Sequence, residues 1–241
     1  MSPLKDKVAI VTGASAGIGE ATARELAAAG ATLVLTARRA PLLEKLAADL
    51  GGGTAIFAAD LAEEIQPQRL LEFVLARFGG ADLLVNNAGI LRIGDSETFD
   101  LAALRPMIAI NYEAVVRASY LFAQAMKAKG HGHIINISSI GANILSPDTG
   151  VYGGLKKALE TFTDALRIEM AGTGVRVGLV APGTTSTEIF SDMKSKGAPG
   201  WDEYIPPLDA ADVARAVRYM AEQPARANVA RVHVYSASEG F

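Results

Sequence analysis

Short runs rich in β-branched residues alternate along this chain with longer Ala- and Leu-rich stretches of helical period. This alternation is typical of strand–helix–strand units, whose parallel sheet is buried on both faces. Strands are expected at residues 7–12, 32–37, 54–59, 82–87, 133–138, 175–181 and 231–236. Helices are expected between them, and Gly30, Gly79 and Gly130 are placed to end three of these helices. The pattern therefore predicts a seven-stranded, mostly parallel sheet with helices on both faces.

The sequence contains no linker-like change of composition and no internal repeat, so residues 1–241 are expected to form one doubly wound α/β domain. Residues 184–207 are the exception, because Gly and Pro interrupt weak helical pieces there. The large apolar side chains of this segment are Ile189, Phe190, Met193, Trp201 and Tyr204. So long a connection is uncommon in a compact domain unless it is a lid or binding loop. We predict a substrate lid; the alternative is a surface excursion that packs its aromatic side chains on its own domain.

Charge and composition limit the partners of the chain. A net charge of −3 with interspersed acids and bases gives no basic face for a nucleic acid or a membrane surface. No segment approaches the roughly 20 apolar residues that span a bilayer, and no secretory signal is apparent, so a cytoplasmic location is expected. With no cysteine and only His131, His133 and His233, neither a disulfide nor a metal site is expected. The first two histidines are expected at a turn and a strand edge. The partner is expected to be a small molecule or another protein.

The sequence TGASAGIG follows the first expected strand and opens a helix. Gly13 allows a tight turn, Gly17 lets the backbone approach a ligand, and Gly19 lets the helix pack closely on the strand. The N–H groups at the start of this helix would form an anion site. Between a strand and a helix, this pattern predicts a dinucleotide-binding turn of the Rossmann type, and the alternative is a loop that only turns the chain.

The end of the second strand bears on the choice of dinucleotide. An NAD site usually places an acid there, which holds the ribose 2′-hydroxyl. The sequence instead reads LTARRAP, with Ala37 near the acid position and Arg38 and Arg39 after it. A guanidinium can bind a 2′-phosphate with two hydrogen bonds. The sequence thus predicts NADP(H), unless the two arginines are only a solvated strand end.

Tyr152 and Lys156 lie four residues apart in YGGLK and would share one face of a helix. A tyrosine can give a proton to a carbonyl oxygen, although an ordinary pKa of about 10 makes it a sluggish base near neutrality. An ammonium one turn away is expected to lower that pKa. Gly153 and Gly154 are unfavourable in a helix and suggest a close approach to the backbone, whose purpose the sequence does not give.

Six motifs, in this order, resemble the short-chain dehydrogenase/reductase family. They are TGASAGIG, NNAG at residues 86–89, Asn111, the serine pair of INISS, the Tyr-x-x-x-Lys of YGGLK, and Pro182 with Gly183. The resemblance covers nearly the whole chain. It implies a Rossmann fold and an NADPH-dependent carbonyl reductase, reversible as an alcohol dehydrogenase, for a small to medium, largely apolar ketone or aldehyde. It also implies a homodimer or homotetramer that packs residues 101–129 and 151–173.

The chain departs from the family pattern in two places. Leu155 stands where a serine often precedes the lysine, and the ending ARVHVYSASEGF lacks the common Val-Asp-Gly-Gly. Together with the arginine pair and the sequence PGTTSTE, this ending resembles an NADP-dependent branch of the family.

The resemblance implies roles for the reacting groups. Tyr152 acts as the acid and base, and Ser139, thirteen residues before it, polarises the substrate oxygen. Lys156 orients the nicotinamide ribose, and Asn111 lies at a helix kink that completes a proton relay. Ser138 is expected on the cofactor side, since alternation at a strand end sends adjacent side chains to opposite sides. From the residues alone, Asn111 could also be a tolerated polar residue on an exposed helix face.

The cofactor contacts implied by the resemblance gather at the carboxyl ends of the strands. Arg38 is the better candidate for the 2′-phosphate, Asp60 faces the adenine, and Thr187 bonds the nicotinamide carboxamide. The expected set is Gly13, Ser15, Gly17, Ile18, Gly19, Arg38, Arg39, Asp60, Leu61, Asn87, Ala88, Gly89, Tyr152, Lys156, Pro182, Gly183, Thr185 and Thr187. For the NNAG segment, support of the sheet is at least as strong an expectation as direct contact with the cofactor.

The substrate pocket is expected along residues 90–93 and 140–146 and the lid aromatics, with Arg92 and Asn143 as polar handles. A different class of protein stays open as the alternative: a non-catalytic protein that senses NADP(H) with the same fold. The complete set of Asn111, Ser139, Tyr152 and Lys156 argues against it, because a protein without turnover has no physical need for all four.

Overall fold

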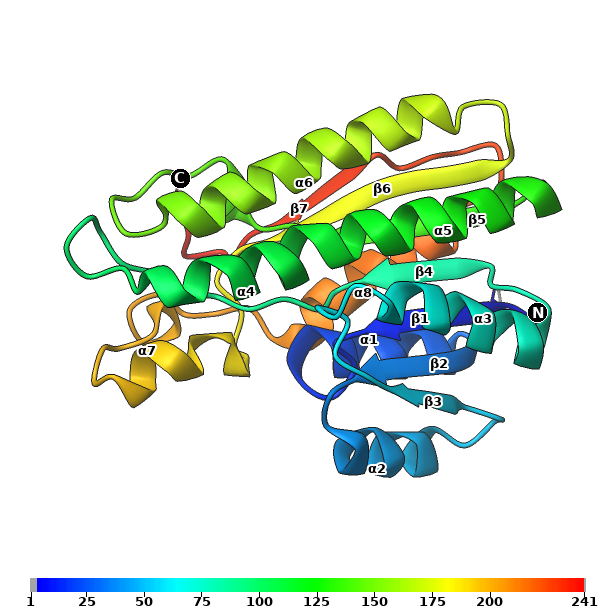
Figure 1. The fold of residues 1–241 in the computed structure, drawn as a ribbon, viewed down its shortest axis with the longest axis horizontal. Coiled ribbons are helices and arrows are strands. Elements are labelled where there is room, and N and C mark those ends of the chain that lie inside the picture. The colour runs from blue at the N-terminus through cyan, green and yellow to red at the C-terminus, as the bar shows by residue number, and fades with distance from the viewer. Residues whose placement is uncertain (1–3, 241) are drawn as a thin grey trace.

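A computed structural model describes residues 4–240 of the chain. Seven strands form one sheet in the order β3-β2-β1-β4-β5-β6-β7 (Figure 1). They are β1 Val8–Thr12, β2 Thr32–Ala37, β3 Ala55–Ala58, β4 Leu83–Asn86, β5 Gly132–Ile137, β6 Val175–Pro182 and β7 Arg231–Val234. All neighbouring pairs are parallel, so the expected doubly wound α/β fold is confirmed and its sheet is wholly parallel. Residues 1–3 and 241 of the expected domain lie outside the described residues.

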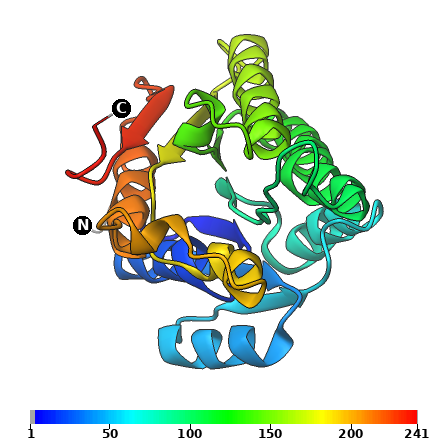
Figure 2. The same ribbon diagram turned by 90° about the vertical axis from the view of Figure 1, so that its left-hand side faces the viewer.

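Helices cover both faces of the sheet (Figures 1 and 2). The helices are α1 Gly17–Ala28, α2 Ala40–Leu50, α3 Gln66–Phe78, α4 Leu104–Ile108, α5 Ala114–Lys129, α6 Gly150–Glu169, α7 Ser191–Ser195 and α8 Ala210–Ala221. Alternate side chains of the strands enter two cores, one with α3, α5 and α6 and the other with α1, α2 and α8. Ile10 of β1 lies in the first core and Val11 in the second. Burial on both faces explains why the strands read as continuous apolar runs.

The expected helix over residues 101–129 is divided. After a 3-10 turn at Leu101–Ala103 and α4, the π-helical turn Ala109–Glu113 leads into α5. Such turns are frequent at functional sites, because the extra residue disturbs the regular backbone bonding. Asn111 lies in this turn and is fully buried, so it is not a polar residue on an exposed face.

The strand order reverses between β1 and β4, because β2 and β3 extend the sheet on one side of β1 and β4 to β7 extend it on the other. In open parallel sheets, ligands bind outside the carboxyl ends of the strands at this point. Residues 184–207 lie across the same end, in yellow and orange at the front of Figure 2. This segment contains the 3-10 turns Glu188–Phe190 and Trp201–Glu203 around α7. Between residues 4 and 240, none of the helices has the length and apolar character to cross a membrane.

Candidate active site

The turn between β1 and α1, residues 13–16, is the glycine turn, and it borders a cavity of about 480 Å³. Gly13 has a φ of +65°, and a Cβ atom there would lie 2.9 Å from Cα of Ala88. A Cβ on Gly19 would lie 2.6 Å from Nδ2 of Asn87, so α1 can approach this turn only with glycine at that position. The N-cap residue Ala16 offers no side-chain acceptor to the first N–H groups of α1. The backbone cradle therefore fits an anionic group such as a pyrophosphate.

Thr12 and Asn87 join this turn to the end of β4. The Thr12 hydroxyl accepts hydrogen bonds from the backbone N–H groups of Asn87 at 2.8 Å and Ala88 at 2.9 Å. In return, Nδ2 of Asn87 donates to the carbonyl of Thr12 at 2.9 Å. The part played by Thr12 was not expected from the sequence, because a threonine at a strand end is common and only the β1–β4 pairing gives it these partners.

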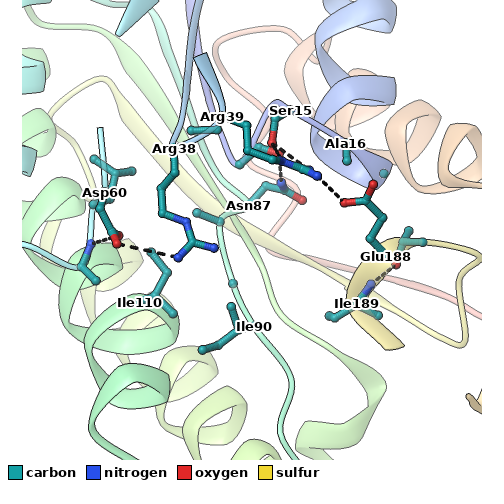
Figure 3. Close-up of a pocket in the computed structure, with 18 of the residues that line it drawn as sticks. Ser15, Ala16, Arg38, Arg39, Asp60, Asn87, Ile90, Ile110, Glu188 and Ile189 are labelled. Atoms are coloured by element: carbon teal, nitrogen blue, oxygen red, sulfur yellow. Dashed lines mark hydrogen bonds and ion pairs between the residues drawn. The ribbon is translucent and has the colours of Figure 1, made fainter. Parts of the chain in front are cut away.

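Two guanidinium groups, those of Arg38 and Arg39, line the cavity (Figure 3). Nη1 of Arg38 lies 3.8 Å from the Asp60 carboxylate. Arg39 donates to the Ser15 hydroxyl at 3.1 Å, and its Nη1 lies 2.8 Å from the Glu188 carboxylate. Both arginines are well exposed to solvent, and these ion pairs are of the weak surface kind. A phosphate would meet two cations here, with Asp60 and Glu188 as the groups it must compete with.

The expected cofactor residues come together in two cavities. All of them except Gly19 line either the cavity beside the glycine turn or a neighbouring cavity of about 350 Å³. Gly19 instead packs against the backbone of Gly13. Ile18, Asn87, Gly89 and Thr187 line both cavities, which makes them parts of one elongated site.

The second cavity, hereafter the catalytic cavity, is lined by the four expected catalytic residues, Asn111, Ser139, Tyr152 and Lys156. They come from the π-helical turn, the end of β5 and α6. A side-chain hydrogen bond joins Ser139 and Tyr152. The Lys156 ammonium donates to the carbonyl of Ile137 at 2.9 Å and lies 5.8 Å from the centre of the Tyr152 ring. A hydroxyl pair and a buried cation thus face one apolar space, where a carbonyl oxygen can receive a proton.

Burial controls the titration of this pair. It raises the pKa of Tyr152 to about 12, although the hydrogen bond from Ser139 acts in the opposite direction. It also lowers the pKa of Lys156 to about 8. The expected lowering of the tyrosine pKa is therefore wrong for this structure, because removal from water penalises the phenolate as well as the ammonium. At neutral pH Tyr152 holds its proton and is ready to donate it.

The adjacent serines point to different partners. The hydroxyl of Ser139 accepts from the backbone N–H of Gly141 at 3.1 Å at the start of the 3-10 turn Ile140–Ala142. Ser138 is buried and donates to the Glu160 carboxylate of α6 at 3.1 Å. Glu160 is only 1% exposed, and Arg231 of β7 neutralises it at 2.8 Å. Ser138 therefore has a structural partner within the protein, and because it also lines the second cavity its expected role on the cofactor side stays a prediction.

Asn111 holds the segment that follows NNAG. Its Oδ1 accepts from the backbone N–H of Ile90 at 3.1 Å, and its Nδ2 donates to the Ile90 carbonyl at 2.9 Å. A Cβ atom on Gly89 would lie 2.6 Å from the same Oδ1. The asparagine thereby fixes the segment after β4, whose residues Gly89 and Leu91 line both cavities.

Asn86 belongs to a buried chain of hydrogen bonds behind the site. It donates to Ser119 of α5 at 3.0 Å and to Asn136 of β5 at 2.9 Å, and Asn136 donates to Thr163 of α6 at 2.8 Å. Paired buried polar groups of this kind fix the relative placement of elements, because any slip would leave one unpaired. This geometry favours the structural alternative for Asn86. An asparagine inside an apolar strand, as in INIS, is the signal that would have revealed Asn136.

The two expected polar handles have partners elsewhere. Arg92 lines the cavity beside the glycine turn, and its Nε lies 3.3 Å from the Asp192 carboxylate of α7. Asn143 bonds to Lys157 and lies within hydrogen-bonding distance of Glu160, and it does not line the catalytic cavity. The expectation for Asn143 was wrong, because partners on α6 hold it outside both cavities. The expectation for Arg92 stays a prediction, because Arg92 lines the adjoining part of the same site.

Residues 184–207 contribute several apolar side chains to the lining of the catalytic cavity, Ile189, Phe190, Trp201 and Ile205. Phe190 and Met193 are buried in one cluster with Tyr152, and Trp201 packs against it. The rings of Phe190 and Trp201 meet edge to face at 5.7 Å. Tyr204 is 72% exposed and contributes nothing to the cavity lining, contrary to the expectation for the aromatic residues of this segment.

The histidines take no part in the site. His133 is a buried residue of β5, not a residue of a turn or edge, and its ring has no hydrogen-bond partner within residues 4–240. Burial and the nearby Arg176 hold its pKa well below the usual value. Over the same residues, His, Asp and Glu side chains form no group of three that could hold a metal ion.

The structure distinguishes the two glycines of YGGLK. A Cβ atom on Gly153 would lie 2.6 Å from the carbonyl oxygen of Gly141, in the turn that bonds Ser139. Gly154 is exposed, and among the described residues a Cβ there would meet nothing within 4 Å. Glycine is therefore required at position 153, where α6 contacts the 3-10 turn Ile140–Ala142 after Ser139, the serine turn. Position 154 has no such requirement.

We expect Gly153→Ala to lower both kcat and stability, the latter by about 1–3 kcal/mol, because the serine turn must move. Gly154→Ala is the matched control and should raise stability by up to about 1 kcal/mol through helix propensity. Urea unfolding and steady-state kinetics measure both effects. Equal behaviour of the two variants would contradict this assignment.

A wholly parallel sheet with a glycine turn, two arginines and a Ser, Tyr and Lys set at its carboxyl edge defines a dinucleotide-binding oxidoreductase. Residues 7–197 match the model of the family described as short chain dehydrogenase, and the chain belongs to that family.

Related proteins agree with this assignment. An uncharacterized oxidoreductase of Staphylococcus saprophyticus is 35% identical over 237 residues, covering 95% of each chain. A probable NADP-dependent dehydrogenase of Haemophilus influenzae is 32% identical, covering 99% of this chain and 96% of the relative. The closed form of a serine dehydrogenase complexed with NADP+ superposes with a TM-score of 0.90 at 30% identity, covering 97% of this chain and 96% of that one.

Proposed function

We propose that this protein is an NADPH-dependent carbonyl reductase, reversible as an alcohol dehydrogenase, that acts on a small to medium, largely apolar ketone or aldehyde. The observation that carries the proposal is the convergence of Ser139, Tyr152 and Lys156 on one buried cavity that adjoins the glycine turn. The NADP-dependent relative and the NADP+-bound structure support the choice of cofactor. A cytoplasmic location also stays a prediction.

The residues of the site fit this cofactor. The cradle around Gly13 and Gly17 would hold the pyrophosphate, while Arg38, Arg39 and Ser15 would hold the 2′-phosphate. Lys156 would hold the nicotinamide ribose. When bound, the cofactor supplies the hydride.

The protein supplies the proton and stabilises the developing charge. Reduction puts negative charge on the substrate oxygen, which needs an acid and a preplaced hydrogen-bond donor. Tyr152 gives its proton to that oxygen, and the Ser139 hydroxyl turns to donate a hydrogen bond to it. Lys156 then favours the phenolate that is left behind. Asn111 and the π-helical turn complete the route by which a proton returns.

The lining of the catalytic cavity favours apolar substrates. Ile140, Ile144, Leu145 and Ile205 are among its lining residues. Lys156 and Glu239 are the charged lining residues found within residues 4–240, and the ammonium of Lys156 is already bonded to a backbone carbonyl. A substrate carboxylate would have no free cation there, so keto acids should be poor substrates.

Two further expectations concern larger features. We propose that residues 184–207 act as a lid, because Phe190 belongs to the same buried cluster as Tyr152 and Trp201 packs against that cluster. We also propose a homodimer or homotetramer that packs residues 101–129 and 151–173, in which Leu101 and Ile168 are 78% and 66% exposed. Light scattering tests the assembly, and a monomer would contradict it.

The decisive experiment is a screen of NADPH oxidation against aromatic and aliphatic ketones, aldehydes and keto acids. Tyr152→Phe serves as the blank. Turnover of apolar carbonyl compounds above this blank is expected. Binding of NADP+ without turnover across the panel would instead favour the non-catalytic sensor.

Cofactor preference has its own test. Arg38→Asp should raise KM for NADPH about 100-fold, because a charge-assisted pair is lost and a repulsion is added. KM for NADH should fall or stay unchanged. Arg226→Asp, at an exposed position outside both cavities, is the charge-matched control. Unchanged preference in Arg38→Asp would remove Arg38 from the phosphate site.

A further inference from the structure

Glu239 lies in the segment after β7 and reaches back to the turn that leaves β6. Its Oε1 accepts a hydrogen bond from the backbone N–H of Thr184 at 2.7 Å. Its Oε2 accepts another from the backbone N–H of Ser236 at 2.8 Å. Hydrogen bonds to an ionised carboxylate are about twice as strong as neutral ones. One side chain thus joins two backbone segments, and it also lines the catalytic cavity.

The same carboxylate explains the glycine at position 183. The φ of Gly183 lies outside the left-handed region, so the backbone there does not itself require glycine. A Cβ atom at this position would collide with Oε2 of Glu239 and lie 2.9 Å from its Cδ. Glycine is therefore needed for space, and the group that occupies that space is the carboxylate.

Thr184 is held from both sides. Its N–H is bonded to Glu239, and its carbonyl accepts from the N–H of Leu208 at 2.8 Å. The N–H of Ser186 in turn donates to the Leu208 carbonyl at 2.9 Å. The N–H of Gly183 donates to Val234 of β7 at 2.7 Å. Both ends of the segment 184–207 are fixed at this one point, beside Thr185 and Thr187.

We propose that Glu239 is a positioning residue for the nicotinamide end of the site. Its carboxylate fixes the backbone of residues 183–187, which carries Thr185 and Thr187 and begins the segment over the catalytic cavity. The inference rests on the proposed function, since that function places the nicotinamide at these threonines. Glu239 acts through the backbone and takes no part in the chemistry.

Calorimetric titration with two ligands separates positioning from general stability. NADP+ uses the whole site, whereas adenosine 2′,5′-bisphosphate uses only the end beside Arg38 and Arg39. Glu239→Gln keeps the shape but places an amide N–H group opposite one of the two backbone donors, and Glu239→Ala removes both acceptors. Both variants should weaken NADP+ binding about tenfold and leave binding of the bisphosphate unchanged. Glu72→Gln, at an exposed position of α3 outside both cavities, is the control and should change neither.

A double variant tests the contact with Gly183. Gly183→Ala alone should weaken NADP+ binding, and the same change in the Glu239→Ala background should add little further loss, because the space is then free. Thermal unfolding checks that each variant is folded.

Each contrary outcome has a distinct meaning. Unchanged NADP+ binding in both Glu239 variants, equal weakening of both ligands, or additive losses in the double variant would overturn the positioning role and leave the proposed function standing. Failure of the unaltered protein to bind NADP+ would overturn the proposed function and this inference together.

Discussion

Tyr152→Phe is expected to lower kcat for carbonyl reduction by about 10³-fold, within the range for removal of a general acid. The phenyl ring keeps the packing of the buried cluster around Leu91, Phe190 and Met193, so the variant should fold. Only the hydroxyl that gives the proton is lost. Binding of NADP+ should change little, which separates loss of chemistry from loss of the site.

Single-turnover NADPH oxidation with the best carbonyl compound measures this loss directly, and calorimetry supplies the control. A variant that retains more than about a tenth of the rate would show that another group or water delivers the proton, since general acid catalysis contributes at least about 10².

The pH dependence follows from burial of the same pair. Tyr152, with a pKa of about 12, keeps its proton through the neutral range. Lys156, with its pKa lowered to about 8, loses its positive charge above that pH. The charge favours the phenolate that forms as Tyr152 gives up its proton, so the reduction rate should be level below pH 8 and fall above it. The fall of the reduction rate above pH 8 should be absent in Lys156→Met. A rate that rises through pH 8 in the unaltered protein would contradict this assignment.

Ser139→Ala should lower kcat by about 10²–10³-fold, as expected for loss of one donor to a developing oxyanion. Ser138→Ala should leave kcat within a few-fold of the original. It removes one of the hydrogen bonds to the buried Glu160 carboxylate, so its cost of about 1–3 kcal/mol should appear in the free energy of unfolding.

Steady-state kinetics and urea unfolding of both serine variants test the contrast. An active Ser139→Ala together with an inactive Ser138→Ala would reverse the two roles. Equal losses of activity would mean that the end of β5 as a whole, and not one hydroxyl, controls the reaction.

Much of the fold could be predicted because its signals are local. Each expected strand boundary lies within two residues of the observed one, since β-branched runs between helical stretches have few alternatives in a sheet buried on both faces. Gly79 and Gly130 end α3 and α5 in the left-handed conformation, as their positions predicted. The motif residues also met at one edge of the sheet, because parallel strands bring all their carboxyl ends together.

The errors concern long-range contacts. Asn143 was expected to face the substrate, but Lys157 and Glu160 of α6 hold it outside both cavities. The importance of Glu239 could not be predicted, because its partner Thr184 lies 55 residues away and nothing local marks the pair.

The sequence by itself determined the parallel α/β domain, its family, and the glycine, arginine, serine, tyrosine and lysine residues of the site, because these depend on spacing along the chain. Only the tertiary structure decided which glycine of YGGLK is needed and in which direction the tyrosine pKa moves. The reason is that burial and competition among distant side chains set these properties. In Tyr152 and Lys156, removal from water outweighs the attraction that their spacing alone suggested.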